Sequence, residues 1–350
     1  MYSGGVSTAR DFWVINSSDK ILLKNMQNTI TFCKNADLNN IDMDLTKIKW
    51  SSGLKSKIKN QIPKFDKNAL RKSLHRPFFK QWLYFDDMFN ERQSQIPNII
   101  PNDKTNNLLI CISGAGINNE FSVVITNLIP NGDVVFHSQC FPRYTYTQNQ
   151  KQDNILDSTL NTYQNHYKNS KLTKDNIFYY VYGILHSTRY REKYKTNLKK
   201  QSPHIPMAKQ FTEISDIGRK LANLHLHYDT GKRCKIKRVT TKSFDSKNIN
   251  YFKVRKMRFD KTDKSILYYN DYIKLEKIPP ETHLHTIDGR TPLEWLVDRY
   301  RIKKDPDSGI VNDPNLWFEK PEELLDLIEC VIYSSVETVK LIKKLSSYFI

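Results

Sequence analysis

The chain has 350 residues, and its 55 Lys and Arg against 37 Asp and Glu give a formal net charge of +18 at pH 7. With 39% hydrophobic and 12% aromatic residues, it is too apolar to be a disordered protein. No stretch approaches the roughly 18 apolar residues of a membrane-spanning helix, and the first residues contain no apolar signal core, so we expect a cytoplasmic protein.

The positive charge has two explanations. Of the 55 basic residues 40 are Lys and only 15 are Arg, a profile that AT-rich coding sequences produce without selection for function. A basic chain nevertheless attracts phosphate-bearing partners, so nucleic acid is the expected partner class. The Arg positions are less easily attributed to codon usage and are therefore more informative than the Lys positions.

The first hundred residues mix short strand-like and helical segments. We predict a strand over residues 11–15 and helices over residues 20–35 and 46–59. Residues 73–89 are rich in aromatic side chains that must pack against another part of the chain. A polar loop follows at residues 93–107 and contains Pro97 and Pro101, which makes it the best candidate for a domain boundary. We therefore divide the chain into residues 1–100 and 101–350.

The middle of the chain begins with two apolar runs, residues 108–113 and 121–128, which are typical of paired strands. A third strand is expected over residues 133–136, after a turn that contains Asn131 and Gly132. The period of the apolar residues then becomes helical over residues 177–199 and 207–228.

Strand periodicity returns over residues 231–275, with turn signals at residues 245–248 and 260–263. Two helices are predicted to end the chain, over residues 292–300 and 321–345. The predicted fold is therefore α+β, with mixed, mostly antiparallel strands and several packed helices. There is no repeat with a period of 20–50 residues.

Metal and disulfide chemistry find little support in the sequence. The five Cys residues are widely spaced and form no Cys-x-x-Cys pair, so neither a disulfide framework nor a structural zinc site is indicated. The pairs His225/His227 and His283/His285 lack further spaced ligands and favour ordinary half-buried histidines. We predict no metal site.

Common catalytic motifs are also missing. Gly114 and Gly116 follow an apolar run, as in a dinucleotide or S-adenosylmethionine loop, but Asn118, Asn119 and Glu120 lead into another strand, which favours a hairpin turn. The Asn/Asp-Pro-Pro-aromatic loop of amino-methyltransferases, the Gly-x-x-x-x-Gly-Lys-Ser/Thr loop and the Glu-x-Lys pattern of magnesium nucleases are absent. No catalytic residue is assigned in this chain.

The feature that most suggests nucleic-acid binding lies between residues 232 and 261. This segment contains twelve basic and two acidic residues, an excess of ten basic residues. On strands, alternate basic residues would form a ribbon that follows a phosphate backbone or enters the major groove; a solvated hairpin surface is the alternative. The predicted DNA-binding residues in this window are Lys232, Arg233, Lys235, Lys237, Arg238, Lys253, Arg255, Lys256 and Arg258. Secondary candidates, which combine cations with aromatic side chains or pack at the edge of the core, are Arg143, Tyr144 and Arg189.

Several short motifs follow one another along the chain in a characteristic order. They include the segments at residues 5–13 (GVSTARDFW), 75–85 (HRPFFKQWLYF), 182–187 (YGILHS), 288–295 (DGRTPLEW) and 308–314 (SGIVNDP). Each is weak by itself, but in this order and at these distances they are specific. Through them the whole chain resembles the C-terminal specificity region of Type ISP restriction-modification enzymes.

The resemblance implies that recognition and catalysis belong to different domains. In that family one polypeptide carries a nuclease, an ATP-driven translocase, an adenine methyltransferase and a final target-recognition domain that reads an asymmetric DNA site. Residues 1–100 would resemble the junction with the methyltransferase, and residues 101–350 the recognition domain. The expected partners are double-stranded DNA and the catalytic domains on the same or a companion chain. No cofactor is expected here, because S-adenosylmethionine, ATP and Mg²⁺ would belong to those upstream domains.

Two alternatives stay open. The first is a remnant of an S-adenosylmethionine-dependent DNA methyltransferase that uses Gly114 and Gly116. The second is an interaction scaffold without sequence-specific DNA binding.

Overall fold

The fold is built around a four-stranded antiparallel sheet that separates two hydrophobic cores. The computed structural model describes residues 1–38, 44–116, 120–148, 150–240, 243, 248, 250–320 and 322–348. In this sheet, of order β1-β8-β5-β6, the strands β5 (Leu109–Ile112) and β6 (Val123–Thr126) are buried along their whole length. Because side chains alternate along a strand, each of the two strands contributes to both cores.

The residues of β5 and β6 show this division directly. Ile110 and Ile112 belong to the core that packs against the helices of residues 157–226. Leu109 and Cys111 belong to the other core, which draws residues from Val6 to Ile332. Burial on both faces explains why the two runs are apolar without alternation. The predicted pairing is confirmed by the antiparallel register of β5 with β6.

The remaining strands form two further four-stranded sheets and two hairpins among the described residues. The first sheet, β2-β4-β3-β7, is antiparallel except for the parallel pair of β3 and β7. The second, β11-β14-β13-β12, is wholly antiparallel. The strands not yet given are β1 (Ser3–Gly4), β2 (Ile15–Asn16), β3 (Leu70–Arg76), β4 (Phe79–Tyr84), β7 (Ile129–Pro130), β8 (Gln139–Pro142), β9 (Tyr144–Thr147), β10 (Gln150–Asp153), β11 (Lys237–Thr240), β12 (Arg258–Phe259), β13 (Leu267–Tyr268), β14 (Ile273–Glu276), β15 (Lys303–Lys304) and β16 (Val311–Asn312).

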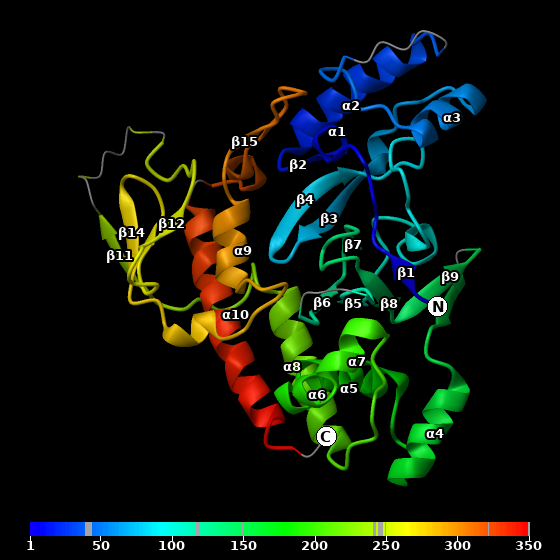
Figure 1. Cartoon of the computed structure of the whole chain (residues 1–350), viewed down its shortest axis with the longest axis vertical. Helices are drawn as coiled ribbons and strands as arrows, with labels where there is room; N and C mark the ends of the chain where they lie inside the picture. The colour runs from blue at the N-terminus through cyan, green and yellow to red at the C-terminus, as the bar shows by residue number, and fades with distance from the viewer. Residues whose placement is uncertain are drawn as a thin grey trace.

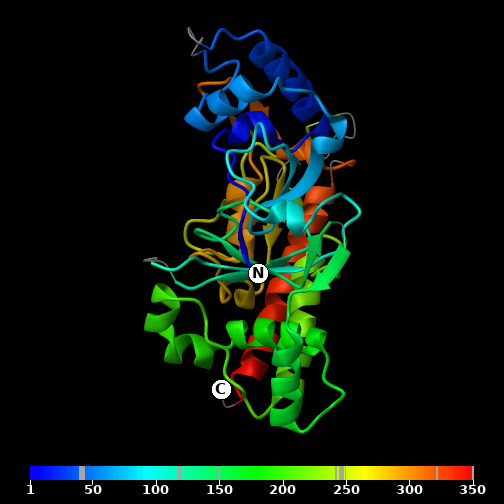
Figure 2. The same ribbon diagram turned by 90° about the vertical axis from the view of Figure 1, so that its right-hand side faces the viewer.

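The helices cover the outer faces of the sheets. The molecule is elongated, with α2 and α3 at one end and α4 to α8 at the other, while α10 runs along much of its length (Figures 1 and 2). The predicted mixed α+β fold is confirmed. The α-helices are α1 (Asp11–Val14), α2 (Asp19–Lys34), α3 (Ser52–Asn60), α4 (Asp157–Tyr167), α5 (Lys174–His186), α6 (Thr188–Lys193), α7 (Lys195–Lys200), α8 (Phe211–Leu226), α9 (Pro292–Arg299) and α10 (Glu323–Leu345), and the 3₁₀ segments are η1 (Lys67–Ala69), η2 (Ile96–Asn98), η3 (Pro280–His283) and η4 (Pro314–Trp317).

Several predicted elements need correction, two of them because side-chain capping sets a helix boundary. The predicted strand at 11–15 is a helical turn, α1, followed by β2. The predicted helix at 46–59 begins only at Ser52, because the Ser51 side chain accepts the backbone N–H of Leu54. The predicted helix at 177–199 is divided into α5, α6 and α7, since Ser187 ends one helix and caps the next.

The predicted turn at residues 130–133 is present, but the predicted hairpin and third strand are not. Residues 133–136 form no strand; Val134 and Val135 are buried within a turn. Gly132 donates its backbone N–H to the carbonyl oxygen of Val6 at 2.7 Å, so this turn binds the N-terminal segment and forms no hairpin. The division at residue 100 stays a prediction.

Candidate nucleic-acid interface

The basic window of residues 232–261 lies on the sheet β11-β14-β13-β12 and on the segments that flank it. The predicted single ribbon is wrong, because β11 and β12 are the two opposite edges of this sheet. Residues 253–257 form no strand; Val254 and Met257 are both buried, three positions apart, in place of the expected alternation. The predicted turn residues 245–247 and Lys242 lie outside the described residues.

Four of the predicted cations are held by carboxylates. Arg238 contacts Glu329 at 2.9 Å and Asp326 at 3.2 Å, and Arg233 contacts Asp326 at 2.7 Å. Both acids belong to α10, so these two arginines attach the β11 edge to that helix. This is a structural role that competes with DNA contact.

The other two ion pairs lie within and beside the sheet. Lys237 lies directly across from Glu276 and contacts it at 2.9 Å, and Lys253 lies 3.5 Å from Asp313. Hydrogen bonds from Lys274 and Lys237 lower the pKa of Glu276 to about 2, so its carboxylate stays charged at neutral pH.

Arg258 is engaged in a different way. Its guanidinium lies over the ring of Tyr268, 4.1 Å from the centroid, yet the residue is exposed. Such a stacked guanidinium keeps its outer donors free for a phosphate or a base edge. Arg258 therefore remains compatible with DNA contact.

The other predicted DNA-binding cations of this window are exposed and form no ion pair among the described residues; they are Lys232, Lys235, Arg255 and Lys256. Arg255 and Lys256 are the better presented pair. The backbone of Val254 exchanges two hydrogen bonds with the side chain of Asn315, at 2.9 and 2.8 Å. With Val254 and Met257 buried on either side, this short segment is anchored while both cations project from it.

The secondary candidates Arg143 and Arg189 differ in burial and in ion pairing. Arg143 is buried and contacts Asp153 at 2.5 Å and Asp175 at 2.6 Å, and its guanidinium covers the ring of Tyr144 at 4.3 Å. These contacts tie the β9-β10 hairpin to α5, which makes Arg143 a structural residue. Arg189 is exposed on α6 and forms no ion pair among the described residues.

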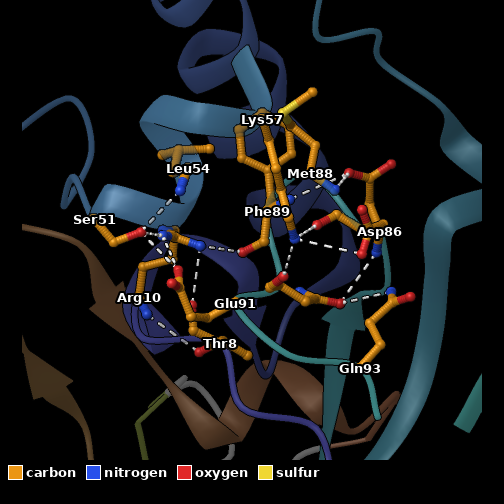
Figure 3. Close-up of polar contacts among 12 residues, drawn as sticks. Thr8, Arg10, Ser51, Leu54, Lys57, Asp86, Met88, Phe89, Glu91 and Gln93 are labelled. Carbon is orange, nitrogen blue, oxygen red and sulfur yellow. Dashed lines mark hydrogen bonds and ion pairs between the residues drawn. The ribbon is translucent and has the colours of Figure 1, made fainter. Parts of the chain in front are cut away.

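The segment at residues 5–13 has a structural centre at Arg10 (Figure 3). Its fully buried guanidinium donates to the carbonyl oxygens of Phe89 at 2.6 Å, Thr8 at 3.1 Å and Lys49 at 3.2 Å. It also contacts Ser51 Oγ at 2.7 Å and Glu91 at 3.0 Å (Figure 3). Burial lowers the pKa of Arg10, which Glu91 opposes. One side chain thus joins three segments of the chain.

A cleft of about 760 Å³ lies beside this centre, lined by residues 4–13 and by parts of the turns at 131–133 and 305–307. Both charge signs occur in it, with Lys49 and Arg92 against Asp133 and Asp307. It therefore lacks the uniform positive charge expected for a phosphate-binding groove.

Sequence reasoning missed a second basic cluster, which brings Arg76 together with residues 299–303. The available signal was local: residues 299–304 contain four cations in six positions. Arg76 could not have been added from the sequence, because more than 220 residues separate it from the others.

The proposed cofactor loop is a connection between antiparallel strands, as β5 and β6 show, although residues 117–119 lie outside the described residues. A Cβ on Gly114 would lie 2.6 Å from the carbonyl oxygen of His137, so this glycine permits close backbone packing. In the part of the chain that the structure describes, no group of three or more His, Cys, Asp or Glu side chains could hold a metal ion. No helix among the described residues has the length and apolarity needed to cross a bilayer.

Comparison with solved structures identifies similar proteins along the whole chain. A nuclease-deletion mutant of the Type ISP restriction-modification enzyme LlaGI, in complex with a DNA substrate mimic, is 30% identical with a TM-score of 0.88. The ATP-dependent Type ISP enzyme LlaBIII bound to DNA is 29% identical with a TM-score of 0.92, and DrdV in a DNA complex is 28% identical with a TM-score of 0.90. This chain is fully covered in each comparison but spans only 33%, 23% and 36% of those chains.

Comparison with curated proteins gives no match. The model of the Type ISP C-terminal specificity domain matches residues 1–327, and the motifs at residues 5–13, 75–85, 182–187, 288–295 and 308–314 all lie in that range. The chain therefore belongs to the family of Type ISP C-terminal specificity domains.

Proposed function

We propose that this chain is the DNA sequence-recognition module of a Type ISP restriction-modification enzyme. It would position an asymmetric duplex site for an adenine methyltransferase and an ATP-driven translocase and nuclease on the same or a companion chain. The main evidence is structural similarity over the full chain, at TM-scores of 0.88 to 0.92, to three proteins whose structures contain DNA or a DNA substrate mimic.

The charge distribution supports this proposal. Arg255 and Lys256 are exposed cations on an anchored segment, with no carboxylate at ion-pair distance among the described residues. Uncompensated cations on an anchored backbone segment suit phosphate contacts, because no internal ion pair has to be broken when they bind. Arg238 and Arg143, which are already paired, are proposed to hold the fold.

Selection from random duplexes at two salt concentrations tests the function. A recognition module returns one consensus at both concentrations, and its binding constant falls as salt rises. Recovery of no consensus would contradict the proposal and leave an interaction scaffold.

A matched pair of variants then tests the assigned residues. We expect Arg255→Ala to weaken DNA binding without changing the unfolding temperature, while Arg238→Ala lowers that temperature. A loss of about 1–3 kcal/mol at one base position would make Arg255 a base-reading residue, and a uniform loss would make it a phosphate contact. Equal behaviour of the two variants would contradict the assignment.

The cofactor assignment needs its own measurement. S-adenosylmethionine, ATP and Mg²⁺ are proposed to act in the catalytic domains, so calorimetry should detect no binding of S-adenosylmethionine to this chain. A measurable heat of S-adenosylmethionine binding would instead favour a methyltransferase remnant.

A further inference from the structure

A positively charged pocket lies where the N-terminal elements meet the segment after α9. Its volume is about 160 Å³, and its charged lining consists of Arg76, Arg299, Arg301, Lys303, Asp11 and Asp298. These residues come from α1, β3, α9 and the segment of β15, and α1, β2 and β15 lie close together in Figure 1. The approach of Lys303 to the ring of Phe12, 5.0 Å from its centroid, confirms that β15 packs against α1.

The pocket has more cations than its carboxylates neutralise. Asp298 alone serves three guanidinium groups: Arg290 at 2.8 Å, Arg299 at 3.3 Å and Arg301 at 3.8 Å. Lys303 and Arg76 have no carboxylate at ion-pair distance among the described residues.

The second carboxylate does not change this balance. Asp11 accepts a hydrogen bond from the hydroxyl group of Thr8 and forms no ion pair among the described residues. Counting Arg290, five cations therefore share two acids, and only one of these acids is in ionic contact with them. The pocket thus has the excess positive charge of an anion site.

Buried donors in the pocket also lack partners. Arg299 Nε is buried without a hydrogen bond, because its position 3.3 Å from Asp298 does not give hydrogen-bond geometry. His75 Nδ1 is likewise buried without a partner among the described residues, and it can donate in the tautomer that carries its proton. Leaving a buried donor unpaired is unfavourable, so an acceptor that enters the pocket would gain a hydrogen bond from Arg299 Nε, and from His75 in that tautomer.

The crowding of the cations acts in the same direction. Burial lowers the pKa of Arg299, and the charges of Arg76, Arg290 and Arg301 lower it further, against the attraction of Asp298. An incoming anion would relieve this repulsion and favour the charged guanidinium.

The size and donor set select the ligand class. A volume of about 160 Å³ lies below the roughly 300–1,000 Å³ of pockets that bury drug-sized ligands, so the pocket suits one small anion better than a whole nucleotide. Guanidinium forks match the oxygen geometry of phosphate. We propose that this pocket binds a phosphate group, and that its source is one backbone phosphate of duplex DNA; this inference rests on the proposed function.

The neighbouring chain favours DNA as the source. The backbone N–H of Ile302 donates to the carbonyl oxygen of Arg255 at 3.0 Å. The segment that exposes Arg255 and Lys256 therefore runs directly beside Arg301 and Lys303. Exposed cations from two parts of the sequence therefore lie on neighbouring backbone segments, an arrangement that an extended polyanion can contact at several points and a free phosphate ion cannot.

Lys303 and Lys304 provide a matched test, because they are adjacent and exposed on β15 but only Lys303 lines the pocket. Fluorescence anisotropy of the full chain with its selected duplex, over a series of KCl concentrations, measures affinity and salt dependence. We expect Lys303→Ala to weaken binding roughly tenfold for all base sequences and to reduce the slope of log K against log salt by about 0.9. Lys304→Ala should change the affinity and the salt slope much less. Lys303→Arg, which keeps the positive charge, should bind DNA about as well as the wild-type chain.

Other outcomes separate the two proposals. If the wild-type chain binds its duplex but Lys303→Ala and Lys304→Ala behave alike, the pocket assignment is overturned and the proposed function stands. If the wild-type chain binds no duplex, the proposed function is overturned, and the DNA source with it.

Inorganic phosphate as a second probe identifies the source. It should raise the unfolding temperature of the wild-type chain only at millimolar concentration, because one site alone binds a small anion weakly. Protection at micromolar phosphate that Lys303→Ala abolishes, with unchanged DNA affinity, would replace the DNA phosphate by a free phosphate ion. Thermal unfolding without phosphate confirms that each variant is folded.

Discussion

Three buried histidines make the stability of the fold depend on pH. The rings of His186, His225 and His285 lie with centroids 5.4 to 6.0 Å apart, between α5, α8 and the segment after η3. Burial is the largest cause that lowers the pKa of each, to about 4 for His225. The nearby Arg191 adds to the effect for His186 and His285.

Only one of the three can be removed without leaving a partner unpaired. His225 accepts or donates hydrogen bonds with the hydroxyl groups of Tyr182 at 2.7 Å and Thr338 at 2.9 Å. His285, in contrast, has no hydrogen-bond partner for either ring nitrogen among the described residues and is 4% exposed. We therefore expect His285→Leu to leave stability at pH 7.5 unchanged or raised, while His225→Leu loses about 1–3 kcal/mol.

The magnitude follows from proton linkage. A histidine that stays neutral when folded but has a pKa of about 6.5 when unfolded is protonated first in the unfolded chain. Its contribution to stability is therefore complete above pH 6.5 and is lost as pH falls toward the folded pKa. Between pH 7.5 and 5.0 one such group costs about 2 kcal/mol, and the slope near pH 5.5 is about 1.2 kcal/mol per pH unit.

Urea unfolding at half-unit steps from pH 5.0 to 7.5 measures this slope. We expect His285→Leu to lower the slope near pH 5.5 by about 1.2 kcal/mol per pH unit relative to the wild-type chain. His204→Gln is the control, because His204 is exposed and should leave the slope unchanged. Identical slopes for all three proteins would show that His285 is not held neutral in the folded state.

Three further substitutions test structural assignments. Arg10→Ala should lower the free energy of unfolding by about 3–5 kcal/mol in urea titrations, because Glu91 loses its ionic partner and several buried carbonyl oxygens lose their donor. A loss below 1 kcal/mol would contradict the structural role of Arg10. Arg143→Ala should lower the unfolding temperature yet leave the salt slope of DNA binding unchanged, and a reduced slope would restore it as a phosphate contact. Gly218→Ala should destabilise by about 3 kcal/mol or more in thermal unfolding, because its Cβ would lie 1.9 Å from the carbonyl oxygen of Tyr179 across the α5-α8 contact, and an unchanged unfolding temperature would refute that close approach.

The sequence by itself determined the elements whose signals are local. The paired apolar runs at β5 and β6 predicted strands because burial on both faces removes polar residues from them, and the long apolar stripe of α8 predicted a helix. The α+β class and the family followed from the same local patterns and from motif order. Some errors arose where one polar side chain sets a helix boundary: Ser51 caps the start of α3, and Ser187 ends α5 and caps α6.

Only the tertiary structure decided which cations are available. Arg238 and Arg255 are equivalent by local charge and both exposed, yet Arg238 contacts two carboxylates from α10, while Arg255 lies beside β15 with no ion pair among the described residues. The pocket that joins Arg76 to Lys303 is likewise invisible in the sequence. Whether a charge binds a partner or its own fold depends on distances between residues far apart in the chain, and folding alone sets those distances.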